Sequence, residues 1–262
     1  MVLDRPAALW RECAEIVRFC RELTDEEWLA PSRAPGWRVQ DVVAHLGASC
    51  HALFTPASLK LIGSKRIERT NDEFVDARRE WAPARVLAEF ELWSRRLRPL
   101  SLALDRTPLG RLPVPLGELG RFPARLLLNS ALVFDQHTHL RHDLAPALGR
   151  PAPRTDELRI AVVLEWMIAV LGNQLRQARP SWLNRPIALS LGGPGGGRWR
   201  IGVDGTVTTA PADSGDSAVH IAGAAAEFPE WGTARSSWRE RDVKIDGDVD
   251  LGVALLDSLN VV

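Results

Sequence analysis

Residues 34–53 read APGWRVQDVVAHLGASCHAL, and this stretch indicates both the start and the buried face of a helix. A proline and a glycine interrupt regular structure at its beginning. After them, apolar side chains recur at steps of three and four residues, the spacing of one helix face. The residues of that stripe are Val39, Val42, Val43, Leu46, Cys50 and Leu53. His45 lies at the shoulder of the stripe, so we expect it to face a neighbouring helix.

The same period recurs elsewhere in the first part of the chain. Further helices are predicted over residues 9–23, 71–97 and 123–142. Thr24, followed three residues later by Glu27, is a capping-box pattern and predicts a short additional helical turn. Helices that each have one apolar face bury those faces against one another. The sequence therefore predicts a four-helix bundle over residues 1–150.

A stretch rich in proline and glycine, LAPALGRPAPRTDEL at residues 144–158, follows the bundle and predicts a linker. Beyond it, apolar and polar residues alternate at 199–203, and Asp204-Gly205 is a hairpin-turn signal. Further strands are expected near 207–209, 219–221 and 243–245, with helices at 158–175 and 249–259. This order predicts a small α+β domain over residues 151–262, so the whole chain falls into the α+β class.

Composition narrows the functional classes. The chain has 262 residues with 33 basic and 33 acidic side chains, so its formal net charge is zero. Nucleic acids and anionic membranes attract a basic excess, and we therefore expect neither as a partner. The apolar run at 160–171 is too short to span a membrane and contains Glu165. Three cysteines and a start without a signal pattern favour a reducing, cytoplasmic location.

Several familiar motifs do not fit. The glycine-rich run at 192–197 lacks the spacing and the following Lys-Ser/Thr of a phosphate-binding loop, so we interpret it as a connector. Arginines cluster at 95–98 and 239–241 beside acidic residues, which is typical of solvated surfaces. The metalloprotease pattern His-Glu-x-x-His and the di-iron pattern Glu-x-x-His are absent from the sequence.

Histidines gather in two of the predicted helices. His45 and His51 lie in the helix quoted above, and three more histidines lie near the end of the fourth helix. Asp135 and His139, four residues apart, share one face of that helix, and its earlier positions are apolar. A carboxylate on an inner face needs a partner. Together with His45, this pair would leave coordination positions open, as in catalytic zinc sites. A buried histidine–aspartate hydrogen bond without metal is the alternative.

These residues resemble the mycothiol-dependent maleylpyruvate isomerase family, whose N-terminal domain is a DinB-like four-helix bundle. PGWRVQDVVAHL at residues 35–46 is close to the family pattern Pro-Gly-Trp-x-Val-x-Asp-Val-x-x-His-Leu. A second similarity lies in DQHTHLRHD at residues 135–143, and a third, weaker one in VKIDGD at residues 243–248. The resemblance spans nearly the whole chain.

The resemblance implies a metal site made of His45, Asp135 and His139. The family has glutamate where this chain has Asp135, one methylene shorter, and His142 and Asp143 are the alternative ligands or outer partners. The resemblance also implies an arginine from the second domain, for which Arg235 is our match, and a surface salt bridge is the alternative role for that residue. We expect the substrate cleft between the two domains, with Trp37 and Trp231 as its candidate walls.

The chemistry implied by the resemblance follows from zinc or another divalent metal. Bound zinc lowers the pKa of a thiol, here mycothiol or a similar low-molecular-weight thiol cosubstrate. In the isomerases the thiolate adds to a conjugated double bond of a small electrophilic substrate, permits rotation and leaves. Related bundles are thiol S-transferases. An arginine would hold the carboxylate of an anionic substrate.

Two other functions remain open at this point. The chain is alternatively a non-catalytic module that binds or senses a small ligand, built on a degenerate member of the family. A DNA-binding role has only scattered arginines to support it, and it ranks last.

Overall fold

The computed structural model describes residues 3–211 and 217–261. It divides the chain into two compact units, one of Asp4–Arg154 and one of Thr155–Val262 together with Met1–Leu3. A helical unit is followed by an α+β unit, which confirms the predicted fold class. The boundary expected at residue 150 lies just before this division.

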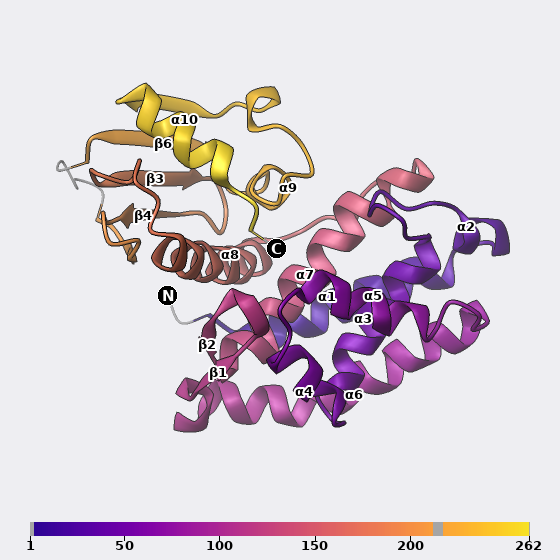
Figure 1. The fold of residues 1–262 in the computed structure, drawn as a ribbon. Coiled ribbons are helices and arrows are strands. Elements are labelled where there is room, and N and C mark those ends of the chain that lie inside the picture. Colours follow the sequence, from indigo (N-terminus) through magenta and orange to yellow (C-terminus); the bar gives the residue numbers. More distant parts are fainter. Residues whose placement is uncertain (1–2, 212–216, 262) are drawn as a thin grey trace. The chain divides into compact units, whose positions relative to one another are not determined.

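The first unit is a bundle of helices. Its long helices α3 and α6 run side by side, α1 packs against α6 and α7, and α3 contacts the segment that continues α7 (Figure 1). The helices are α1 (Arg5–Arg21), α2 (Asp25–Leu29), α3 (Val39–Ala52), α4 (Ala57–Ile62), α5 (Ile67–Asp76), α6 (Pro83–Arg106) and α7 (Leu132–Thr138). The expected capping box of Thr24 and Glu27 begins α2.

Helix α3 is the most enclosed element of the bundle. Its residues from Val39 to Ala48 are all buried, and so the helix has no solvent-facing stripe over that length. Asp41 fixes its first turn, because Oδ2 accepts a hydrogen bond of 2.9 Å from the backbone N–H of Arg38. The amide of Gln40 donates to the carbonyl of Trp81 at 2.7 Å, which ties the start of α3 to the segment before α6.

The prediction of a single helix over residues 71–97 is wrong. The structure has α5, which ends at Asp76, and a separate α6, which begins at Pro83. Proline is favoured in the first turn of a helix, where its missing N–H has no partner to lose. Helix α6 also continues to Arg106, beyond the predicted end at residue 97.

The fourth bundle helix starts later and ends later than its pattern indicated. Residues 113–123 form a small antiparallel pair, β1 (Pro113–Pro115) with β2 (Arg121–Pro123). Helical backbone then runs from Ala124 to Leu144, within two residues of the predicted bounds, and wider π-type turns, η3 (Leu126–Ala131) and η4 (His139–Leu144), flank α7. Such turns often occur at functional sites.

The second unit is a five-stranded sheet with helices on its apolar face. The strand order is β5-β4-β3-β6-β7, with β3 and β6 parallel and the other neighbours antiparallel. Gly172 of α8 lies against Val207, and Gly252 of α10 lies against Ile245. The elements are α8 (Glu157–Ala178), β3 (Ile187–Gly192), β4 (Gly197–Ile201), β5 (Val207–Thr209), β6 (Val219–Ala224), α9 (Phe228–Trp231), β7 (Lys244–Gly247) and α10 (Val249–Ser258).

The glycine-rich run forms the turn between β3 and β4, as a connector would. Gly193 and Gly195 have φ values of 97° and 78°, which favour glycine. The turn at Asp204-Gly205 joins β4 to β5, and Gly205 has a φ of 77°. Strand β3 itself was not predicted.

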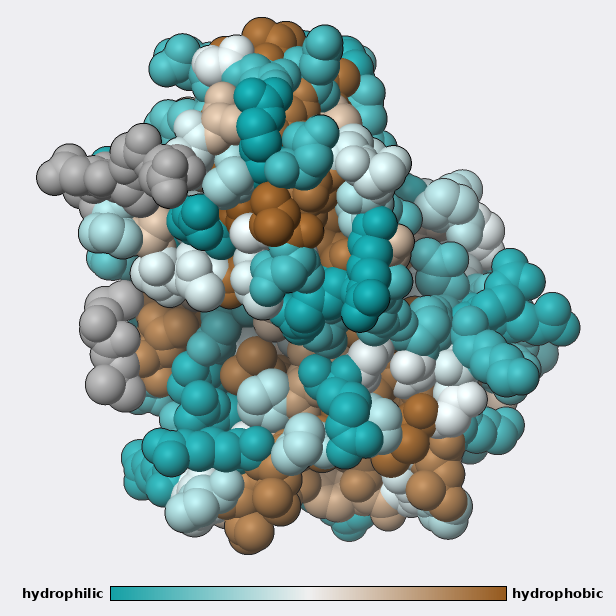
Figure 2. Space-filling view, turned by 60° about the vertical axis from the view of Figure 1, so that its left-hand side comes forward, coloured by the Kyte–Doolittle hydropathy of each residue, from teal (hydrophilic) through white to brown (hydrophobic). Residues whose placement is uncertain are grey.

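Helix α8 is long and apolar enough to cross a membrane by composition, but 67% of its apolar window is buried. A buried core helix passes the same test, so this helix is weak support for a membrane role. On the face shown in Figure 2, hydrophobic residues form separate patches interrupted by hydrophilic ones.

Candidate metal centre

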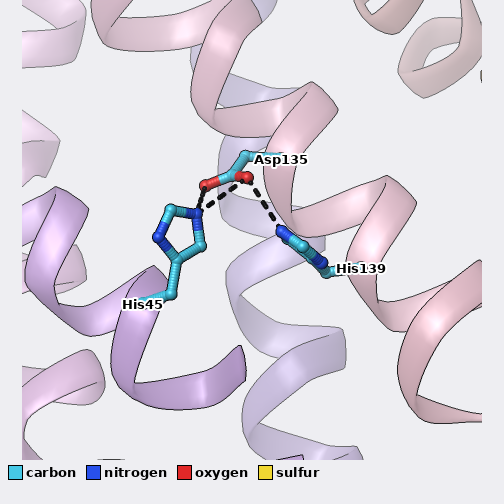
Figure 3. A group of neighbouring side chains, drawn as sticks. All are labelled: His45, Asp135 and His139. Carbon is cyan, nitrogen blue, oxygen red and sulfur yellow. Dashed lines mark hydrogen bonds and ion pairs between the residues drawn. The ribbon is translucent and has the colours of Figure 1, made fainter. Parts of the chain in front are cut away.

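Three side chains from two helices converge inside the bundle (Figure 3). Asp135 lies in α7, and His139 follows it by four residues at the start of η4, so both point from one helix face. His45 points toward them from α3. Its Nε2 lies 3.2 Å and 3.1 Å from the two carboxylate oxygens of Asp135, and His139 Nε2 lies 3.3 Å from Asp135 Oδ1. The structure thus brings together the three residues that the sequence singled out.

The geometry fits a shared metal ion. One ligand atom from each residue lies within 4.8 Å of the others. Zinc binds histidine nitrogen and carboxylate oxygen at about 2.0–2.2 Å, so two atoms bound to one ion lie at most about 4.4 Å apart. The measured separations between the histidine nitrogens and the Asp135 oxygens fall inside that limit. Two imidazoles and one carboxylate form a donor set with positions left for further ligands.

The site is largely, though not completely, enclosed. The side chains of His45 and His139 are 6% and 11% exposed, and that of Asp135 is 23% exposed. Burial alone would raise the pKa of Asp135, but His45 and His139 hold it below its usual value. Burial lowers the pKa of His139, whereas hydrogen bonds with Asp135 and Asp143 raise it to about 9. Metal binding at His139 therefore requires the release of a proton.

The two histidines have different outer contacts. His139 Nδ1 lies 2.7 Å from Oδ2 of Asp143, a side chain that is 2% exposed. Nδ1 of His45 is buried and has no hydrogen-bond partner among residues 3–211 and 217–261. Asp143 therefore contacts His139 and is not in the converging group, and its role as an outer partner of a metal stays a prediction. His142 is not in the converging group.

Trp37 forms an aromatic neighbour to both histidines. Its ring centroid lies 5.1 Å from that of His45 and 6.2 Å from that of His139. The turn before α3 places it there: Gly36 has a φ of 79°, and the N–H of Trp37 donates to the carbonyl of Ala34. The indole N–H donates to Asp72 of α5 at 2.9 Å. No pattern in the sequence indicated this role of Asp72.

The remaining candidates lie elsewhere. Arg235 is in the second unit, just after α9, where its backbone N–H donates to the carbonyl of Glu230. Cys50, on α3, is fully buried and is not in the converging group. Burial is the main cause that raises its pKa well above the usual range.

Comparison with known proteins points to one family. Residues 9–128 match the family model described as the mycothiol maleylpyruvate isomerase N-terminal domain. The chain resembles this family. The match includes His45 and ends before Asp135, so two of the three converging side chains lie outside it. No curated protein matches the chain.

Solved structures support the same likeness in fold. The crystal structure of the mycothiol-dependent maleylpyruvate isomerase matches with a TM-score of 0.58 and 17% identity, over 94% of this chain and 93% of that chain. A histidine-to-alanine mutant of that isomerase matches with a TM-score of 0.53, with the same identity and coverage. At this identity the likeness shows the fold, which extends through both units.

Proposed function

We propose that the protein binds a divalent metal ion, zinc by its donor set, and acts as a thiol-dependent isomerase or S-transferase. The observation that carries the proposal is the convergence of His45, Asp135 and His139 inside a bundle whose first part matches the isomerase N-terminal domain. Mycothiol or a similar small thiol is the proposed cosubstrate, and a small electrophile is the proposed substrate.

A bound zinc ion supplies Lewis acidity, which lowers the pKa of a thiol that reaches it. The chain's own residues prepare that site. His45 and His139 present Nε2 toward Asp135, whose carboxylate supplies the negative charge that offsets a divalent cation. Trp37 lies beside both imidazole rings, with its ring centroid 5.1 Å from that of His45 and 6.2 Å from that of His139.

The nucleophilic sulfur comes from the cosubstrate in this proposal. Cys20 and Cys50 are buried and Cys13 is half-buried, and burial is the main cause that raises the pKa of all three thiols. Such thiols carry little thiolate at neutral pH and are poor nucleophiles. The protein therefore needs an external thiol for this chemistry.

Arg235 is the proposed anchor for a substrate carboxylate, since guanidinium groups bind carboxylates with two parallel hydrogen bonds. Arg235→Lys should raise KM for an anionic substrate more than it lowers kcat, and an unchanged KM would show that Arg235 does not anchor the substrate.

The neutral net charge and the few cysteines support a cytoplasmic enzyme with small-molecule partners rather than one that binds nucleic acid or membranes.

Metal analysis tests the first step. The purified full chain should contain, or take up after chelation, about one zinc or cobalt ion per molecule. Co²⁺ should give a visible absorption band, and an added thiol should produce a sulfur-to-metal charge-transfer band. His45→Ala should weaken binding of the ion.

His51→Ala is the matched control for that variant. His51 lies on the same helix, but its Nδ1 pairs with Glu89 at 2.9 Å, away from the site. Metal affinity should be unchanged in this variant. A wild-type chain that refuses added zinc and cobalt would contradict the proposal.

One observation favours the second candidate, a ligand-binding module without catalysis. The three side chains already contact one another directly, through a hydrogen bond of His45 with Asp135 and an ion pair of His139 with Asp135, so the cluster is also compatible with a site that has no metal. In that case His45→Ala and His139→Ala would leave the affinity for the small ligand unchanged.

A further inference from the structure

The two histidines of the candidate centre differ in their contacts at Nδ1, the ring nitrogen that faces away from Asp135. His139 Nδ1 has a buried carboxylate, Asp143, at 2.7 Å. His45 Nδ1 is buried and has no hydrogen-bond partner in the described part of the chain. Apart from the contact of its Nε2 with Asp135, the ring of His45 is therefore held by packing, in which Trp37 is its nearest aromatic neighbour at 5.1 Å. The ring of His139 is also fixed by a hydrogen bond.

This difference affects how well each ring serves as a ligand. A neutral imidazole that binds metal through Nε2 carries its proton on Nδ1. At His139 that proton has an acceptor, and the Asp143 carboxylate both orients the ring and makes Nε2 more basic. At His45 the same proton would be a buried donor without a protein acceptor, which costs free energy when the metal-bound state forms.

Chain geometry adds to the asymmetry. Asp135, His139 and Asp143 follow one another at steps of four residues along α7 and η4, so one continuous helical segment supplies two donors and an outer partner. His45 comes from a different helix, α3. One continuous helical segment therefore sets the relative positions of Asp135, His139 and Asp143, whereas the position of His45 depends on how α3 packs against that segment.

We infer that Asp143 is a positioning residue that makes His139 the anchoring ligand of the centre, and that His45 is the more weakly held ligand. This inference rests on the proposed metal binding. It predicts an unequal loss of affinity when the two histidines are removed, although both offer the same type of nitrogen.

Titration of the metal-free full chain with Co²⁺ tests the inference. His139→Ala should weaken Co²⁺ binding at least about tenfold more than His45→Ala does. Asp143→Asn should weaken it by about 10- to 100-fold, the range found when outer partners of metal-binding histidines are changed. Asp143→Ala should weaken Co²⁺ binding more than Asp143→Asn does, because asparagine keeps an oxygen that can accept a hydrogen bond from the Nδ1 proton of His139.

Glu89→Gln is the matched control. Glu89 is a buried carboxylate that also pairs with a histidine Nδ1, that of His51, but neither residue belongs to the centre. Its Co²⁺ affinity should stay within about twofold of wild type. In the Co²⁺ protein, the exchangeable Nδ1 proton of His139 should give a shifted proton resonance that Asp143→Ala removes and Glu89→Gln keeps.

The outcomes separate this inference from the proposed function. A wild-type chain that binds no Co²⁺ overturns both. A wild-type chain that binds Co²⁺, with equal losses in His45→Ala and His139→Ala or with no loss in Asp143→Asn, overturns this inference alone. If thermal melting shows that Asp143→Ala does not fold, Asp143→Asn and the two histidine variants decide the matter.

Discussion

At the scale of single residues, Asp135 is the position on which the centre depends most. Its carboxylate lies within 3.3 Å of a nitrogen from each histidine, and no other carboxylate belongs to the group. Asp135→Asn should lower Co²⁺ affinity by at least about 100-fold, because the amide supplies neither the charge nor an equally strong donor. It should also destabilise the metal-free chain by about 1–3 kcal/mol, the cost of a poorly satisfied buried polar group.

Co²⁺ titration and urea unfolding measure these two effects. Asp72→Asn is a suitable control, since Asp72 is an exposed aspartate that contacts Trp37 but neither histidine. Unchanged Co²⁺ affinity in Asp135→Asn would show that the carboxylate is not a ligand.

The buried thiols give a second prediction at this scale. Burial raises the pKa of both Cys20 and Cys50, which lowers the thiolate fraction at a given pH. Iodoacetamide at pH 8 should therefore leave both cysteines unmodified in the folded chain and modify both in urea. Mass spectrometry of the peptides that contain Cys20 and Cys50 measures the extent of modification. Rapid labelling of Cys50 in the folded state would reopen a role for a protein thiol.

The convergence of three residues could be predicted because two simple rules apply to them. His45 lies beside an apolar stripe, and Asp135 and His139 are separated by one helical turn. Asp72 could not be predicted, because it is an exposed residue of α5 and contacts the site through the indole of Trp37. Such a contact depends on how two distant segments pack, which no local spacing reveals.

At the scale of elements, the pairing of Glu27 with Arg150 fixes α2 to the end of the bundle. The two Glu27 oxygens lie 2.7 Å and 2.8 Å from guanidinium nitrogens, and the hydrogen bond with Arg150 is the main cause that lowers the pKa of Glu27. A carboxyl group with a lowered folded pKa stabilises the protein above its unfolded pKa, about 4.3. That contribution is lost as the pH falls through the folded pKa.

Glu27→Gln should accordingly destabilise the chain at pH 7, by up to about 1 kcal/mol for a partly exposed ion pair. The difference from wild type should shrink below pH 4. Urea unfolding of both proteins at pH 7 and pH 3 provides the comparison. An equal difference at both pH values would mean that the charge of Glu27 contributes nothing.

The boundaries of helices and strands were predicted well where a local sequence signal sets them. They were predicted poorly where contacts between distant segments set them. The capping box of Thr24 and Glu27 is local and was correct. The break before Pro83 was missed because apolar residues continue on both sides of it at helical spacing. Strand β3 (Ile187–Gly192) was not predicted, although its buried and half-buried residues alternate in the structure.

At the scale of the whole molecule, the centre and its supports lie in one unit. His45, Asp135, His139, Asp143 and Trp37 all fall within Asp4–Arg154. Arg235, the proposed substrate anchor, lies in the other unit. Metal binding and substrate binding are therefore separable: a chain of residues 1–154 should fold and bind Co²⁺ within about threefold of the full chain, and Arg235 should affect only the full chain.

The stability of the shortened chain should depend on whether it includes residues 151–154, at the end of the first unit. Arg141 is 6% exposed, pairs with buried Glu12 at 2.8 Å, and donates to the carbonyls of Pro153 and Arg154 at 3.1 Å and 3.3 Å. A chain cut at residue 150, the boundary expected from sequence, lacks both carbonyls. It should be less stable than residues 1–154 by about 1–3 kcal/mol, since a buried guanidinium loses two acceptors. Urea unfolding of the two shortened chains measures the difference, and equal stability would mean that water replaces those carbonyls without cost.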